Sequence, residues 1–149
     1  MKTFVDNANR TWTISVNVGA VKRMRELAKF DLMGGNIGEN IGRLSDDPVL
    51  LVDVLWAIVF PQAEKLSIPA EEFAEAIAGD AITFAADALL EEIVDFFPSP
   101  KRKLPRQILD RTKEAEKKML ERLEKMVNSP EVQEQIDKNV ESILNSAMK

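Results

Sequence analysis

Residues 48–66 read PVLLVDVLWAIVFPQAEKL, and this stretch decides the fold. It predicts a helix that is apolar nearly all round, and such a helix belongs at the centre of a domain. Just before it, Asp46 or Asp47 can accept hydrogen bonds from free backbone N–H groups, while Pro48 tolerates the first helical turn. Pro61 lies within the stretch and predicts a kink or an early stop.

The chain after this central stretch reads as a series of further helices. A short helix with Ser67 as a candidate cap is expected to end at Gly79, and a longer helix runs from Asp80 to about Phe97. The string PSP at 98–100 ends that helix. After a basic linker, KRK, we expect two more helices, a long charged one over 104–127 and an amphipathic one over 132–147, separated by the break NSP at 128–130.

The chain before the central stretch opens with a predicted β-hairpin over the first 18 residues. Four apolar residues alternate with polar ones, which places them on one face that must pack on the helices: Trp12, Ile14, Val16 and Val18. Gly19 ends the strand in this interpretation. A short basic helix then runs to about Lys29, a glycine-rich break follows, and another short helix carries Ile37, Ile41 and Leu44.

These elements predict a mainly α protein with two parts. Residues 1–100 form a helical body with the N-terminal β-hairpin, and residues 101–149 form a charged amphipathic helical arm. The net charge of −5 is unevenly distributed. Residues 31–100 carry two basic and fourteen acidic side chains, whereas residues 101–127 carry ten basic and five acidic ones. This segregation has three interpretations. The basic segments fold near the acidic body, they stay solvated, or they offer a basic face to a partner or nucleic acid.

The composition argues against an enzyme. Cysteine, histidine and tyrosine are all absent, which removes thiolate chemistry, disulfides and the commonest general base and metal ligand. The absence of cysteine also fits a reducing cytosol. The N-terminus lacks the apolar region of a signal peptide, and the longest apolar run, 49–60, is too short to span a membrane. We therefore expect a non-enzymatic cytoplasmic protein without cofactor or metal.

Three local patterns contain residue types that other chemistry uses. The cluster GGNIG at 34–38 matches no phosphate-loop spacing and is interpreted as a turn. Four acids could share a helix face and hold a hard cation, although a solvated acidic face is the simpler interpretation: Asp80, Asp87, Glu91 and Asp95. The string KRK with Arg106 and Arg111 could contact phosphates, but no aromatic residue follows Phe97 to stack on bases.

The arm is the most informative segment for function. Each of its two helices shows one apolar stripe that the body, a second copy or another protein's helix must cover. Methionines in the stripe supply adaptable apolar surface. We expect the partner-binding residues to be Ile108, Met119, Leu123, Met126, Ile136, Val140 and Ile143.

Several strings between residues 4 and 100 occur in an order that resembles a known type of protein. They are FVD at 4–6, RTW at 10–12, LSDDPVLLVDVLW at 44–56, PQA at 61–63, IPAEEF at 68–73, AGDAI at 78–82 and ALLEEIVDFFP at 88–98. This order resembles small tail assembly chaperones of phages and prophages, of the siphophage type. No catalytic motif takes part in the resemblance.

The resemblance implies a helical, non-enzymatic protein of the host cytoplasm that is not kept in the mature virion. Such proteins bind the tape-measure protein and help tail-tube protein polymerise around it. Coating a long partner with many copies favours a homo-oligomer. Two other interpretations remain open: a structural adaptor of the particle resembling a head–tail connector, and a small helical regulator that binds nucleic acid through its basic arm.

Overall fold

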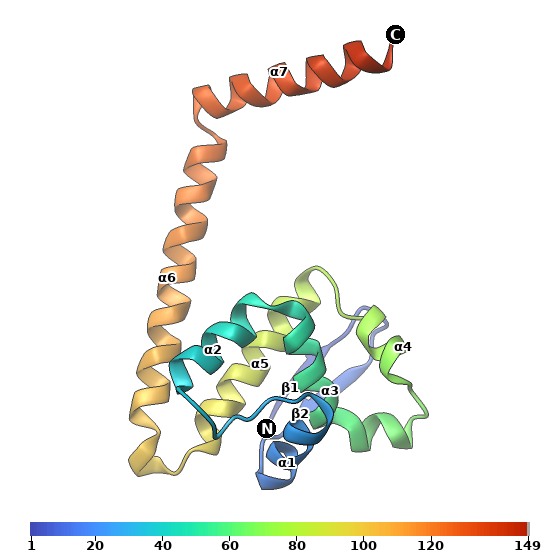
Figure 1. Cartoon of the computed structure of the whole chain (residues 1–149), viewed down its shortest axis with the longest axis vertical. Helices are drawn as coiled ribbons and strands as arrows, with labels where there is room; N and C mark the ends of the chain where they lie inside the picture. Colours follow the sequence, from blue (N-terminus) through green and yellow to red (C-terminus); the bar gives the residue numbers. More distant parts are fainter. Residues whose placement is uncertain (149) are drawn as a thin grey trace. The chain divides into compact units, whose positions relative to one another are not determined.

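The central helix forms as its sequence predicts. In the computed structural model, which describes residues 1–148, α3 comprises Pro48–Lys65 and lies within the first part of the chain (Figure 1). The Asp47 carboxylate caps it by accepting hydrogen bonds from the backbone N–H groups of Val49 and Leu50. Asp47 is therefore the capping aspartate of the two candidates.

The helix α3 continues through Pro61 instead of stopping there. Proline has no N–H, so it cannot donate the helical hydrogen bond to the carbonyl of Ala57. The guanidinium of Arg23 occupies that position: its Nε donates to the Ala57 carbonyl at 2.8 Å, and its Nη2 donates to the Ile58 carbonyl at 3.2 Å. A side chain from another helix thus satisfies the carbonyl that Pro61 leaves open.

The N-terminal hairpin is shorter than the sequence suggested. Strands β1 (Lys2–Val5) and β2 (Thr11–Ile14) pair in antiparallel fashion. Trp12, Ile14 and Val16 are buried as expected, but the prediction for Val18 was wrong, because its side chain is 66% exposed. Asn17 ends the extended segment by accepting from the backbone N–H of Ala20, and this cap starts a helix at Val18.

The remaining helices of the body follow the predicted order. α1 spans Val18–Leu27, α2 spans Ile37–Asp46, α4 spans Ala70–Glu75 and α5 spans Asp80–Phe96. Gly19 therefore lies in the first turn of α1, contrary to the prediction that it ends a strand. Ser67 does not cap α4 either, because the N-cap position is Pro69 and no side chain caps this helix. The glycine cluster forms a turn before α2, with Gly35 at a positive φ of 68°.

The basic segment after α5 is partly helical. A short 3-10 helix, η1 (Ser99–Lys101), leads into α6 (Lys103–Val127), and α7 (Pro130–Ala147) follows. Arg102 donates hydrogen bonds to the carbonyls of Asp95 and Phe97 at the end of α5. Cations near a helix C-terminus are stabilising, so this segment caps α5 in addition to linking two helices.

The described residues thus form a mainly α fold with a two-stranded N-terminal hairpin, which confirms the predicted fold class. The chain divides into a first unit, Met1–Leu109, and a second unit that begins at Asp110. The core of the first unit gathers side chains from the hairpin and from α1 to α5, and it includes Leu109 of α6. The sequence placed the division near residue 100. No helix among the described residues is long and apolar enough to cross a membrane.

Candidate partner-binding site

The acidic side chains of α5 do not gather around a cation. Among the described residues, no group of three or more acids is placed to hold a metal ion. Instead, Arg106 at the start of α6 bonds to Glu91 at 2.8 Å and lies 3.6 Å from Asp95. These contacts neutralise part of the acidic face within the first unit.

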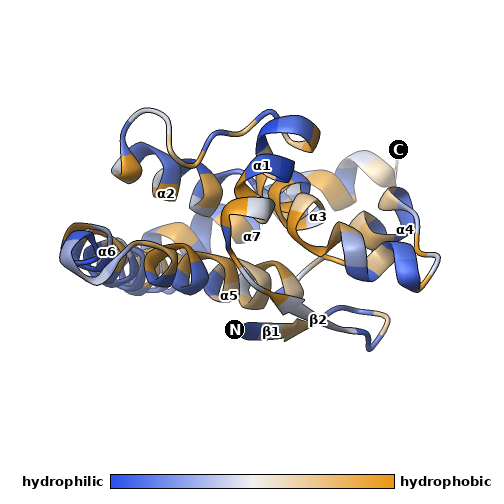
Figure 2. Ribbon diagram, turned by 90° about the horizontal axis from the view of Figure 1, so that it is seen from below, coloured by the Kyte–Doolittle hydropathy of each residue, from blue (hydrophilic) through white to orange (hydrophobic). Residues whose placement is uncertain are grey.

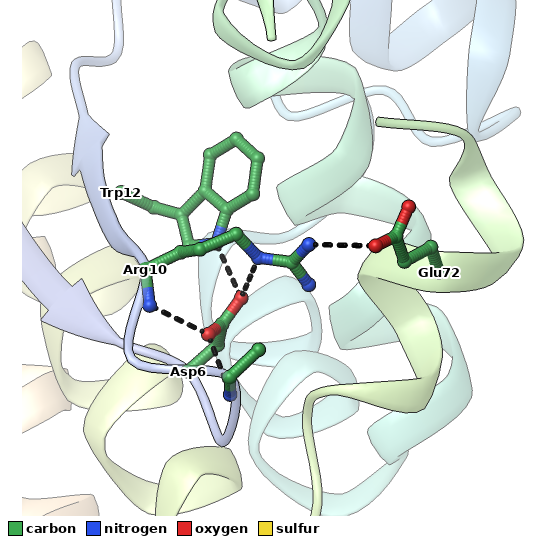
Figure 3. Close-up of polar contacts among 5 residues, drawn as sticks. Asp6, Arg10, Trp12 and Glu72 are labelled. Carbon is green, nitrogen blue, oxygen red and sulfur yellow. Dashed lines mark hydrogen bonds and ion pairs between the residues drawn. The ribbon is translucent and has the colours of Figure 1, made fainter. Parts of the chain in front are cut away.

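A buried polar cluster lies at the tip of the hairpin (Figure 3). The Asp6 carboxylate is 3% exposed and accepts four hydrogen bonds. Its donors are the backbone N–H groups of Ala8 and Arg10, the Nε of Arg10 and the indole N–H of Trp12, each at 2.9 Å. Burial opposes ionisation of this carboxyl, but these hydrogen bonds outweigh it and hold the pKa of Asp6 below its ordinary value.

The same cluster joins the hairpin to α4. Arg10 also donates to Glu72 at 3.2 Å, and the backbone N–H of Asn7 donates to the Ala76 carbonyl at 2.8 Å. The Trp12 ring packs edge-on against Phe73, with ring centroids 5.0 Å apart. Donors of the chain itself occupy both oxygens of Asp6. We therefore interpret the cluster as a structural contact between the hairpin and α4 and not as a reactive site.

The second unit carries exposed apolar faces. Its part of α6 presents three predicted binding residues at helical spacing: Met119, Leu123 and Met126, which are 64%, 49% and 59% exposed. Leu120 and Val127, at 66% and 49% exposure, widen this face. Figure 2 shows both hydrophobic and hydrophilic residues along α6, as expected of an amphipathic helix.

The last helix repeats this arrangement. Ser129 caps α7 by accepting from the backbone N–H of Val132, and Pro130 occupies the first turn. Ile136, Val140 and Ile143 are 41%, 49% and 68% exposed, and Leu144 lies beside them at 58%. The described part of α7 has no buried residue. Within the second unit, no other helix therefore buries this apolar face.

Ile108 differs from the other six predicted residues. It belongs to the first unit, where it is half-buried against the core, with its Cδ1 next to Gly38 of α2. The structure therefore places Met119, Leu123 and Met126 on one helix face and Ile136, Val140 and Ile143 on another, and it does not place Ile108 with either group. Sequence periodicity could not make this distinction, because Ile108 continues the stripe of α6.

We call the two groups in the second unit the α6 face (Met119, Leu120, Leu123, Met126 and Val127) and the α7 face (Ile136, Val140, Ile143 and Leu144). The opposite side of each helix carries charged side chains. Lys118 and Glu114 on α6 form an exposed ion pair at 3.6 Å, and Lys138 and Glu134 on α7 form another at 3.3 Å. Such pairs support an isolated helix by a few tenths of a kcal/mol each, about 0.2–0.5. Comparison of the chain with models of protein families, with curated proteins and with solved structures finds no match.

Proposed function

We propose that this protein is a non-enzymatic phage tail assembly chaperone that binds the tape-measure protein and assists assembly of the tail tube. The observation that carries the proposal is the pair of exposed apolar faces on α6 and α7. The resemblance of residues 4–100 to tail assembly chaperones supports the choice of partner.

Exposed stripes of this kind suit a helical partner. An amphipathic helix binds through side chains at positions such as i, i+4 and i+7, which is the spacing of Met119, Leu123 and Met126. Burial of one such side chain stabilises a complex by about 1–2 kcal/mol, since each starts half-exposed. The methionines adapt their shape to different apolar neighbours, so one face can bind many sites along a long partner.

The proposal includes a place and a stoichiometry. The protein acts in the cytoplasm of the infected or lysogenic host, several copies coat one tape-measure protein, and the chaperone leaves before the virion matures. Contact with tail-tube protein brings the polymerising tube to the coated partner. Nucleic acid and membrane have no part in this function.

The test is co-expression with the long helical protein encoded beside it, followed by size-exclusion chromatography with light scattering. We expect the partner to become soluble with this protein and to co-elute with several copies of it. Ile136→Asp should remove co-elution, because a charge on the α7 face must then be desolvated in the complex. Met119→Asp should weaken the complex in the same way through the α6 face.

Asn145→Asp is the matched control. Nine residues, or about two and a half helical turns, separate it from Ile136, so the same charge lies on the opposite face of α7. It should leave the complex intact, and circular dichroism should show equal helix content in all variants. If the protein runs alone as a closed ring and leaves the partner insoluble, the chaperone proposal fails and a structural adaptor takes its place. Binding that weakens steeply with salt would instead favour a nucleic-acid regulator.

A further inference from the structure

The two edges of the N-terminal hairpin differ in how their backbone groups are used. In an antiparallel pair, residues alternate between those bonded across the pair and those whose N–H and C=O point outward. The N–H of Asp6 donates to the Arg10 carbonyl, and this bond together with the register makes Phe4–Trp12 a bonded pair. Thr3 and Val5 on β1, and Thr11 and Thr13 on β2, therefore direct their backbone groups outward.

At Thr13, the outward edge of β2 is closed by a side chain. The Gln62 amide of α3 accepts a hydrogen bond from the Thr13 N–H at 3.0 Å and donates one to the Thr13 carbonyl at 2.7 Å. This pair of hydrogen bonds reproduces what a neighbouring strand would make. Proteins commonly protect an edge strand in this way, because an open edge pairs with other chains.

The outward edge of β1 has no such cover. Among the described residues, no hydrogen bond joins the outward backbone groups of Thr3 or Val5 to another element. All four residues of β1 line a shallow groove of about 490 Å³ together with Phe84, Asp87, Ala88 and Glu91 of α5. The hairpin and α5 lie next to each other in Figure 2. The groove thus combines an unpaired strand edge with an apolar wall.

Two exposed apolar side chains flank this groove at one end. Phe84 is 57% exposed and Val5 is 48% exposed. The N-terminal amine of Met1 bonds to Glu92 near the end of α5, and the Asn7 side chain donates to the Ala78 carbonyl just before α5 begins. β1 therefore runs opposite to α5, and Val5 lies toward Phe84. Asp87 lies one helical turn from Phe84, whereas Lys2 lines the other end of the groove and Glu91 is paired with Arg106. The end of the groove at Val5 and Phe84 is therefore apolar with one acidic side chain, Asp87.

We propose that the free edge of β1 binds an extended segment of another protein, which adds a third strand to the hairpin. The segment supplies backbone hydrogen bonds to Thr3 and Val5, an apolar side chain against Phe84, and a lysine or arginine toward Asp87. Strand addition draws affinity from backbone bonds and specificity from alternate side chains, which matches this groove. The inference is independent of the α6 and α7 faces and of the proposed chaperone function.

A second copy of this chain is a poorer occupant. If two β1 edges paired, each copy would contribute only the four residues of its strand. The area buried by so short a strand is far less than the roughly 800 Å² per partner that a stable interface buries. A short peptide meets no such requirement, because it binds as one added strand. At the end near Phe84, Asp87 also favours a lysine or arginine of the segment over an acid.

The test uses the full chain, labelled with ¹⁵N, and three acetylated, amidated hexapeptides. The peptides alternate valine with lysine, with serine or with glutamate. We expect the lysine peptide to shift the Thr3 and Val5 amide resonances and to slow their hydrogen exchange at least tenfold at saturation. The serine peptide should bind more weakly and the glutamate peptide weakest. A lysine peptide N-methylated at every residue should have no effect, because it cannot donate to the strand from either edge.

Three variants make the test specific. Val5→Pro removes an outward N–H without removing a bond to β2, and proline is tolerated at a strand edge. Phe84→Ser removes the apolar wall, and Leu66→Ser is the control, since Leu66 is 60% exposed and lies outside the groove. The first two should reduce peptide affinity at least tenfold, and the control should bind as the parent does.

Two results would overturn the proposal. The first is that none of the three peptides shifts the Thr3 and Val5 amides at millimolar concentration. The second is that these amides shift with protein concentration alone, which would make a second copy the occupant. If Val5→Pro fails to fold, as near-ultraviolet circular dichroism would show, Phe84→Ser and the N-methylated peptide still decide between these outcomes.

Discussion

At the residue scale, Asp6 shows how one side chain can join two elements. Its carboxylate bonds to both arms of the hairpin turn, and Arg10 carries the connection on to Glu72 of α4. The pKa of Arg10 is raised above its ordinary value, mainly by the hydrogen bond to Asp6. Replacing a buried charged partner leaves the other groups unsatisfied, so the cluster stabilises the fold as a unit.

We predict that Asp6→Asn lowers the free energy of unfolding by about 2–4 kcal/mol at pH 7. The asparagine NH₂ would face the donors of Arg10 and Trp12, where the carboxylate accepts from both. Urea denaturation measures the difference. Asp31→Asn is the control, because the ion pair of Asp31 with Arg25 is exposed, and its effect should be much smaller.

The pH dependence should follow from the lowered pKa of Asp6. A carboxyl whose pKa is lower in the folded state binds fewer protons there than in the unfolded state. Its stabilisation is therefore complete above an unfolded pKa of about 4 and is lost as the pH falls through the lower folded value. Asp6→Asn should accordingly flatten the loss of stability below pH 4. If the free energy of unfolding of the variant fell with pH below pH 4 as steeply as that of the parent, Asp6 would not be the source of this pH dependence.

At the element scale, α3 depends on a side chain from α1. Pro61 removes one helical hydrogen bond, and Arg23 supplies a donor to the carbonyl concerned. The pairing explains why a helix with an internal proline remains continuous at the centre of the core. It also explains why a basic residue of α1 is directed toward the backbone of an apolar helix.

We predict that Arg23→Met lowers the free energy of unfolding by about 2 kcal/mol. In a Pro61→Ala background, the new N–H of residue 61 satisfies the Ala57 carbonyl, so the same change should cost about 1 kcal/mol less. A double-mutant cycle in urea measures this coupling. Equal losses in both backgrounds would show that Arg23 does not compensate for the proline.

At the scale of the whole molecule, the core closes within the first unit. Its members lie at or before Leu109, and Pro105 and Leu109 are the buried residues of α6. Arg106 adds the contacts to Glu91 and Asp95. The first two turns of α6 therefore belong to the body, although their sequence resembles the rest of that helix.

We predict different outcomes for two truncated chains. Ending the chain after residue 112 should leave the thermal midpoint of the body within about 3 °C of its value in the full chain. Ending it after residue 102 removes Leu109 and the ion pairs of Arg106, and the midpoint should fall by roughly 10 °C. Differential scanning calorimetry tests both. An equal fall in the two truncated chains would place part of the stabilising core beyond residue 112.

The sequence by itself determined most of the elements. The apolar stretch at 48–66, the aspartate cap before it, the prolines after α5 and the alternation from Trp12 to Val16 each express a local rule of backbone or side-chain chemistry. Local rules failed where two elements meet. Val18 continues an alternating pattern and Ser67 is a good capping residue, yet Asn17 and Pro69 hold the positions that start the next helices.

Only the tertiary structure decided which apolar residues are covered. Ile108 and Met119 follow the same helical stripe, but one packs against the core and the other is 64% exposed. The open edge of β1 was likewise invisible in the sequence, because it depends on Gln62 reaching Thr13, forty-nine residues away, and on nothing reaching Thr3 and Val5. Periodicity is a property of one element alone, whereas burial and edge protection depend on contacts between residues far apart in the chain.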